Sequence, residues 1–214
     1  MRTVLLIASA SLLVACASKQ GGTSATGGPS PTPMRPLERM AGQEIVVFPV
    51  QYLAGTDSMG WQQRVPSRAA FLATLDNQIQ DALTARGLSR WTYGSEVERA
   101  SKMNSIIMTD ARTLSAEWLR GRVLPEQTVR DPLASQVRGL VGLKGQRYAL
   151  LPVELRFENA AGGMGVAILR VVLIDSRMAQ IRWVGEIASA PMRAPTTALT
   201  ASVANHFADL VVAP

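Results

Sequence analysis

The side chains that most often do chemistry in proteins are scarce in this 214-residue chain. It contains one cysteine, Cys16, and one histidine, His206. A single cysteine cannot form an internal disulfide, and one cysteine with one histidine cannot supply the three or four ligands of the usual zinc sites. The sequence therefore argues against a disulfide scaffold, an iron–sulfur centre and a structural zinc site, and we expect no cofactor and no metal.

His206 is the only side chain whose unperturbed pKa lies near neutral pH, so a role as general base has to be considered. It lies in a predicted C-terminal helix, close to the apolar positions Val203 and Leu210. The chain has no Gly-x-Ser-x-Gly motif that would supply a nucleophile on a strained turn. A histidine packed at the boundary of the core explains His206 better than catalysis does.

Paired carboxylates are the remaining route to catalysis, because a glycosidase needs neither cysteine nor histidine. Glu154 lies on the polar face of one predicted strand and Arg170 on the next, so an ion pair between the two strands explains both residues at least as well. The other acids of the strand region are Glu158, Asp175 and Glu186. We expect a protein that is not an enzyme.

The amino terminus has the pattern of a secretion signal over residues 1–15. Arg2 precedes an apolar run from Val4 to Val14, which is too short to span a membrane. The run ends in Leu13-Val14-Ala15-Cys16, which resembles the lipobox (LVAC) of bacterial lipoproteins. The resemblance implies that Cys16 becomes the first residue of the mature protein and carries a lipid anchor with acyl chains such as palmitate. An unmodified thiol is the alternative, but no second cysteine is present to pair with it.

A tether and one domain follow the signal. Residues 16–41 are rich in Gly, Ser, Thr and Pro, which is typical of a flexible linker, and the composition changes to that of a folded domain over 42–214. Ala17 follows the cysteine in place of Asp, which by resemblance to the common sorting pattern implies the periplasmic face of the outer membrane if the host is Gram-negative. The domain is thereby expected in the periplasm.

The net charge of +6 is spread thinly along the chain. From residue 44 onward, 18 basic side chains stand against 15 acidic ones. Nucleic-acid-binding modules usually concentrate their charge in a stripe or combine it with stacking aromatics. We therefore expect no nucleic-acid partner.

Hydrophobic periodicity predicts the elements of the domain. Residues 51–66 are expected to be a long loop, and 104–130 is the least legible stretch, with a helical pattern only near 114–119. In the strand at 148–158, alternation predicts that the apolar residues 149, 151, 153, 155 and 157 share one face. The remaining predicted strands are 45–50, 88–93, 166–174 and 180–189, and the helices are 67–87, one from 95, 131–143 and one from 197.

This order of elements predicts an α+β fold. Three sequential antiparallel strands come late in the chain, and strands alternate with helices before them. We expect a mixed, largely antiparallel sheet of four to five strands with helices on both faces.

Two segments of the domain resemble a known superfamily. Ile45-Val46-Val47-Phe48-Pro49-Val50 and the hairpin from Val172-Leu173-Ile174-Asp175 to Ile181-Arg182-Trp183-Val184-Gly185-Glu186 look like the first strand and late hairpin of the periplasmic lipoprotein superfamily. That superfamily includes the amino-terminal domain of the Tol translocation protein, the curli-secretion lipoprotein and the activator lipoproteins of penicillin-binding proteins. The resemblance implies an anticodon-binding-domain-like fold.

Two segments carry residue types that are enriched at protein interfaces. Tyr52, Met59 and Trp61 lie in 51–66, and Trp118, Arg120 and Arg122 lie in 112–130. These six residues are the candidate partner-binding residues. The alternative is that Trp61 and Trp118 pack their own loops onto the core.

The sequence thus favours a non-enzymatic, membrane-anchored lipoprotein that docks onto an envelope assembly, secretion or cell-wall synthesis complex. The alternative is an auxiliary lipoprotein that holds a lipid or glycan in a groove between sheet and helices. A deep apolar pocket would favour the second function, and a solid core with an exposed binding surface would favour the first.

Overall fold

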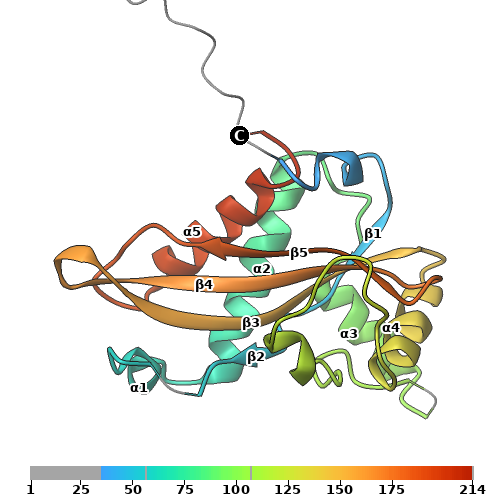
Figure 1. The fold of residues 1–214 in the computed structure, drawn as a ribbon, viewed down its shortest axis with the longest axis horizontal. Coiled ribbons are helices and arrows are strands. Elements are labelled where there is room, and N and C mark those ends of the chain that lie inside the picture. The colour runs from blue at the N-terminus through green and yellow to red at the C-terminus, as the bar shows by residue number, and fades with distance from the viewer. Residues whose placement is uncertain (1–34, 56, 107, 214) are drawn as a thin grey trace, which may run out of the picture. The chain divides into compact units, whose positions relative to one another are not determined.

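A mixed five-stranded sheet forms the centre of the part of the chain that the computed structural model describes, which is residues 35–55, 57–106 and 108–213 (Figure 1). The expected signal peptide, Cys16 and most of the expected tether lie outside these residues. The strand order is β1-β3-β4-β5, and β2 also pairs with β3. The strands are β1 (Ile45–Val47), β2 (Tyr52–Leu53), β3 (Tyr148–Ala160), β4 (Met164–Asp175) and β5 (Gln180–Ala188).

β1 and β2 run parallel to β3, whereas β3, β4 and β5 form an antiparallel meander. The expected α+β fold with a largely antiparallel sheet is confirmed. The helices of this fold are α1 (Trp61–Arg64), α2 (Arg68–Ala85), α3 (Gly94–Met103), α4 (Leu133–Gly142) and α5 (Thr197–Asp209), with 3-10 turns η1 (Glu38–Met40), η2 (Glu117–Arg120) and η3 (Ala161–Gly163).

Local sequence signals set the ends of α2, the longest of these helices. Its N-cap is Ser67, whose hydroxyl accepts a hydrogen bond from the Ala70 N–H. The chain leaves the helix through Gly87, which has φ +85° and so adopts a conformation that favours glycine. The helix expected at 67–87 is confirmed, as are the helices expected from 95, over 131–143 and from 197, each to within about two residues.

Two hydrophobic clusters pack on opposite faces of the sheet. One lies under α2 and α5 and includes the buried residues Leu75, Ile79 and Phe207. The other lies under α3, α4 and the segment 108–129, and includes Leu119 and Leu140. The expectation of helices on both faces is confirmed.

A β-bulge in β3 changes which face its side chains occupy. Pro152 lies opposite Val171 and Glu154 opposite Arg170, so Val153 is one residue more than β4 supplies. Before the bulge the residues 149, 151 and 153 belong to the cluster under α4, and after it the residues 155 and 157 belong to the cluster under α2 and α5. The expectation that all five share one face is wrong, because Pro152 cannot donate to a strand ladder and marks the irregularity.

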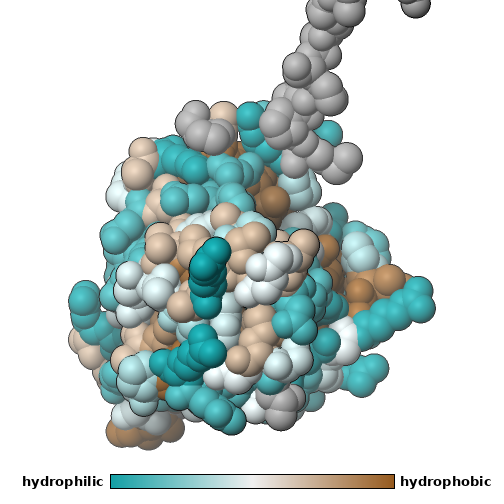
Figure 2. Space-filling view, turned by 90° about the vertical axis from the view of Figure 1, so that its left-hand side faces the viewer, coloured by the Kyte–Doolittle hydropathy of each residue, from teal (hydrophilic) through white to brown (hydrophobic). Residues whose placement is uncertain are grey.

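The outer half of β4 is covered on one face only. Val171 to Asp175 are buried on both faces, but Val166, Ile168 and Arg170 are half-buried. Residues 166–174 are apolar apart from Arg170, a pattern that predicts a strand covered on both sides, and this prediction holds only for their second half. Figure 2 views the side of the protein where this hairpin projects in Figure 1, and most of that surface is hydrophilic or weakly hydrophobic.

Three further expectations need correction. Residues 88–93 form no strand, and only Thr92 makes an isolated bridge, to Val46. Residues 51–66 are not one loop, because β2 and α1 lie within them. The helical pattern near 114–119 corresponds to the single 3-10 turn η2.

The packed region begins before the expected domain boundary at residue 42. Leu37 is 1% exposed, and its N–H donates to the carbonyl of Leu210 just after α5. The chain therefore reaches the fold beside the C-terminal end of α5, near the C-terminus marked in Figure 1.

Candidate functional site

The segment 112–130 is held on the sheet by a buried glutamine. The Gln51 side chain donates from Nε2 to the carbonyls of Pro49 and Ala111, and its Oε1 accepts from the Leu114 N–H. A buried amide with three partners is well satisfied and fixes the backbone around it. This contact positions the start of the segment beside β2.

A buried carboxylate connects the two predicted segments. Asp76 of α2 accepts from the Val50 N–H at 2.8 Å and pairs with Arg112 at 2.9 Å, and Arg112 also contacts Glu98 at 2.6 Å. Burial raises the pKa of Asp76 to about 6, although the Val50 N–H and Arg112 act in the opposite direction. Asp76 therefore joins the chain just before 51–66 to the start of 112–130.

Tyr52 and Arg120 are brought together from the two segments. The Arg120 guanidinium lies over the Tyr52 ring at 5.6 Å and pairs with Glu154, which is 7% exposed. The Tyr52 hydroxyl donates to the Leu114 carbonyl at 3.1 Å. Burial, followed by the neighbouring Glu117 carboxylate, raises the pKa of Tyr52 to about 12, so the hydroxyl stays a donor at neutral pH.

Arg170 of β4 fastens the middle of the segment across the sheet. Its guanidinium donates to the carbonyls of Leu119 and Gly121, both at 2.7 Å, and contacts Glu186 of β5 at 3.1 Å. The expected ion pair between Glu154 and Arg170 is wrong, although the two residues are opposite each other in the register. Glu154 pairs with Arg120 instead, because the bulge redirects β3 at that point.

An open groove lies between this segment and the edge strand. Residues 120–125 form one wall, and Arg170 with residues 184–186 forms the other, around a volume of about 660 Å³. Leu124 is 56% exposed in the wall. The groove thus combines arginines, a carboxylate and exposed apolar side chains, which is a composition suited to a polypeptide surface.

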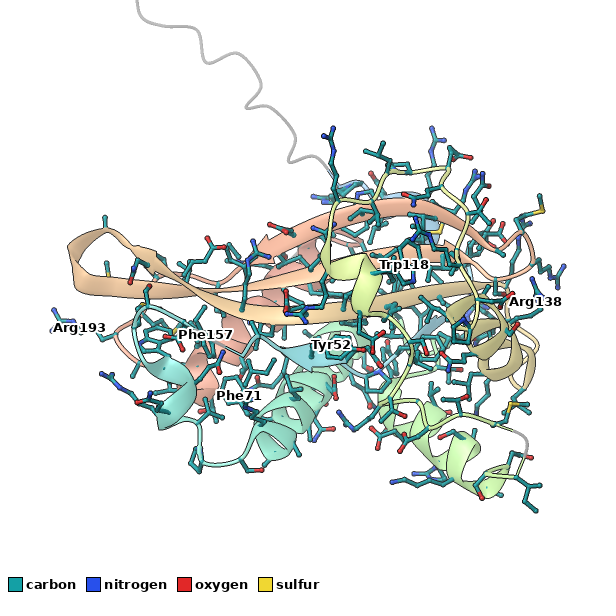
Figure 3. The ribbon with its side chains drawn as sticks, turned by 60° about the horizontal axis from the view of Figure 1, so that its bottom comes forward. Tyr52, Phe71, Trp118, Arg138, Phe157 and Arg193 are labelled. Atoms are coloured by element: carbon teal, nitrogen blue, oxygen red, sulfur yellow. The ribbon has the colours of Figure 1, made fainter. Side chains whose placement is uncertain are left out.

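Of the six predicted binding residues, Arg120 and Arg122 line the groove. Tyr52 lies under Arg120, and half-buried Trp118 lies nearby with the Arg130 guanidinium 5.2 Å from its ring. Figure 3 shows Tyr52 and Trp118 near the middle of the sheet.

Met59 and Trp61 lie elsewhere, at the hairpin end of the sheet. Trp61 is 3% exposed and packs edge-on against Phe157 at 5.4 Å, and Phe71 contacts the same ring at 6.1 Å (Figure 3). The indole also lies against the Gly165 backbone, together with half-buried Met59. For Trp61 the packing alternative describes the structure, and its side chain is not available at the surface.

The other residues that line the groove were absent from the predicted binding residues, among them Leu124, Arg170, Val184 and Glu186. Leu124 carried the one visible signal, as a large apolar residue between Val123 and Pro125 in a segment with two arginines. Arg170, Val184 and Glu186 lie on strands whose spatial neighbours become known only once the sheet is paired.

The candidate catalytic side chains are engaged in structural contacts. Glu158 and Glu186 pair with Arg156, and Asp175 pairs with Arg147. The hydrogen bonds from Arg156 are the main reason why the pKa of Glu186 is lowered. His206 is exposed, and its Nδ1 donates to the Ala188 carbonyl at 2.6 Å.

Within the described part of the chain, no group of three or more histidine, cysteine or acidic side chains is placed to hold a metal ion. The same residues include no helix that is both long and apolar enough to cross a membrane.

Comparisons with known proteins gave matches only among solved structures. No family model and no curated protein sequence matches the chain. The LpoB C-terminal domain from Salmonella enterica matches with a TM-score of 0.38 and 16% identity, covering 69% of this chain and 82% of that one. The PelC dodecamer from Paraburkholderia phytofirmans matches with a TM-score of 0.39 and 11% identity, covering 80% and 91%.

Lipoprotein GNA1162 from Neisseria meningitidis also matches, with a TM-score of 0.34 and 17% identity over 68% of this chain and 78% of that one. At such identities the likeness concerns the fold alone.

Proposed function

We propose that this chain is a non-enzymatic, lipid-anchored periplasmic protein that docks onto a protein complex of the cell envelope, which works in envelope assembly, secretion or cell-wall synthesis. Its docking surface is the groove between residues 120–125 and the edge strand β5. The exposure of Leu124, together with unpaired Arg122 and half-exposed Arg120 in one wall, is the observation that supports this role. Among the described residues, Arg122 makes no ion pair.

The lipid-holding alternative requires space between the sheet and its helices. The interface of the sheet with α2 and α5 is filled by large buried side chains such as Leu75, Leu83 and Phe207. The groove itself is open and lined by arginines, which suits a polypeptide better than an acyl chain. We therefore favour docking over ligand storage.

Cross-linking in intact cells, read by mass spectrometry, tests the docking surface. The full chain is compared with the double variant Arg122→Glu/Leu124→Ser, and a matched control changes Arg90 to Glu and Met178 to Ser, which are exposed residues outside the groove. We expect an envelope protein that is captured by the parent chain and by the control but lost with the groove variant. Equal capture by all three proteins would remove the groove from the proposal.

Membrane fractionation tests the anchor. Cys16→Ala removes the sulfur that the lipobox resemblance assigns to lipidation, so the variant should leave the membrane fraction and lose incorporated palmitate. A variant that stays in the membrane fraction to the same extent as the parent chain would contradict the lipid anchor.

A further inference from the structure

β5 is an edge strand of the sheet, and part of its outer edge already forms backbone hydrogen bonds with another segment of the chain. The Glu126 N–H donates to the Ile181 carbonyl at 2.7 Å, and the Ile181 N–H donates to the Gln127 carbonyl at 2.9 Å. Thr128 also forms an isolated antiparallel bridge with Gln180. The chain thus adds a short extended segment of its own to the start of this edge.

In the rest of β5, hydrogen bonds show which residues direct their backbone N–H and C=O groups away from β4. The Ser189 N–H donates inward to Ala167 of β4, whereas the Ala188 carbonyl accepts from His206 on the outer side. Backbone groups of successive strand residues alternate in direction, so Val184 and Glu186 also direct their N–H and C=O groups outward. Within the described residues, no other backbone group bonds to these two residues on that side.

The groove runs beside this unpaired stretch. Val184 and Glu186 belong both to the free edge and to the groove, and Leu124 and Arg122 stand in the facing wall. The surface therefore offers alternating backbone donors and acceptors, an apolar contact and a cation without an ion pair.

We propose that residues 184–186 of β5 accept an added β-strand from a protein partner. The strand is an extended segment whose apolar side chain packs on Leu124 and Val184 and whose carboxylate reaches Arg122. The inference rests on the proposed function, because it states how the groove docks. In strand addition the backbone bonds supply affinity and the side chains supply specificity.

The free edge itself selects this kind of occupant. Unpaired N–H and C=O groups at strand spacing match another backbone, whereas a lipid chain supplies neither donors nor acceptors. A second copy fits less well. Antiparallel self-pairing centred on Glu186 places two glutamates opposite each other, and pairing centred on Val184 brings residues 187–189 of the second copy onto the positions that 126–129 occupies.

A proline at the free edge separates backbone pairing from side-chain contact. Val184→Pro removes the outward N–H, and proline is tolerated on edge strands whose N–H faces solvent. Val184→Ala is the matched control, since it keeps the N–H and shortens the side chain. Thermal unfolding of both variants shows whether the fold is retained.

The probe is a random heptapeptide library displayed on phage and selected on the full chain, followed by fluorescence anisotropy with the selected peptides. We expect peptides that alternate apolar and polar residues and contain an acidic one. Their affinity should fall by about tenfold or more with Val184→Pro, which is the usual effect of a lost hydrogen bond, and by about threefold or less with Val184→Ala. Amide hydrogen exchange at Val184 and Glu186 in the parent chain should slow when peptide binds.

Several results would overturn strand addition. They are a library that yields no binder, peptides that bind Val184→Pro as well as Val184→Ala, and exchange at Val184 and Glu186 that is unchanged by peptide. The hydrogen-exchange measurement uses the parent chain, so it tests strand addition even if the proline variant does not fold. Self-association of the full chain that Val184→Pro abolishes would instead assign the edge to a second copy.

The same variants separate this inference from the proposed function. If Arg122→Glu/Leu124→Ser abolishes capture in cells and a folded Val184→Pro does not, the groove docks without strand addition. If neither change affects capture, the proposed docking surface is itself wrong.

Discussion

The segments 51–66 and 112–130 carry the same kinds of residue but do different things. The first folds onto the hydrophobic cluster under α2 and α5, where Trp61 is 3% exposed. The second crosses the opposite face of the sheet, fixed by Gln51 and Arg170, and leaves Arg122 and Leu124 at the surface. The difference shows why residue type alone does not identify a binding surface. In 51–66 the segment packs on the core through its tryptophan, whereas in 112–130 polar contacts to the backbone hold the segment and leave other side chains exposed.

The largest expected effect tests whether 51–66 is part of the core. Trp61→Ala should lower the free energy of unfolding by about 3–5 kcal/mol, because it empties a buried site against Phe157. Trp118→Ala should cost about 1–2 kcal/mol, since Trp118 is half-buried at the margin of the cluster under α3 and α4, with Arg130 stacked on its ring. Urea-induced unfolding measures both, and equal losses would erase the contrast between the segments.

The next effect concerns Asp76, which joins the two segments. Its pKa of about 6 in the folded protein lies above the ordinary value of 3.8, so the folded state binds this proton more tightly than the unfolded state does. The resulting stabilisation is present below about pH 3.8 and is lost as the pH rises through about 6, with a total on the order of 3 kcal/mol.

Asp76→Asn cannot titrate, so its deficit in unfolding free energy relative to the parent chain should be largest near pH 4 and shrink toward pH 7. Urea unfolding of both proteins across this range is the measurement. A deficit that grows with pH would mean that Arg112 and the Val50 N–H outweigh burial, and that the carboxylate stabilises the junction in its charged form.

A smaller effect tests how closely 51–66 packs on the hairpin. A Cβ at Gly165 would lie 2.5 Å from Met59 Cε and 2.7 Å from Trp61 Cη2. Met59 can move aside but the buried indole cannot do so easily, so Gly165→Ala should cost about 1–3 kcal/mol in unfolding free energy. Gly42→Ala is the control, because a Cβ there meets nothing within 4 Å. Similar values for the two variants would show that Trp61 packs loosely.

The smallest expected effect belongs to 112–130. Arg122→Glu should change the unfolding free energy by no more than about 0.5 kcal/mol, because the side chain is exposed and makes no ion pair among the described residues. Its effect should be confined to binding. A clear loss of stability in thermal unfolding would place Arg122 among the structural arginines with Arg120 and Arg170.

The sequence predicted the meander and the long helices because their signals are local: Ser67 at the start of α2, Gly87 after its end, alternation in β3 and the continuous apolar run of β4. It missed the change of face in β3, although Pro152 inside an apolar strand was a usable sign of the bulge. Arg120 and Arg122 were predicted from residue type alone. Glu186 and Val184 were missed because their roles depend on which strand lies at the edge, and that follows from long-range pairing.

The bulge at Val153 changes which face of the sheet the odd-numbered residues of β3 occupy. Before the bulge the odd-numbered residues pack in the cluster under α3 and α4, and after it the odd-numbered residues pack in the cluster under α2 and α5. Deleting Val153 would restore unbroken alternation and leave the remaining side chains on their present faces, whereas deleting a residue elsewhere in β3 would turn the side chains between that position and the bulge to the opposite face. β3 can therefore lose one residue at the bulge without exchanging its two faces, but losing one elsewhere would move side chains from one hydrophobic cluster to the other.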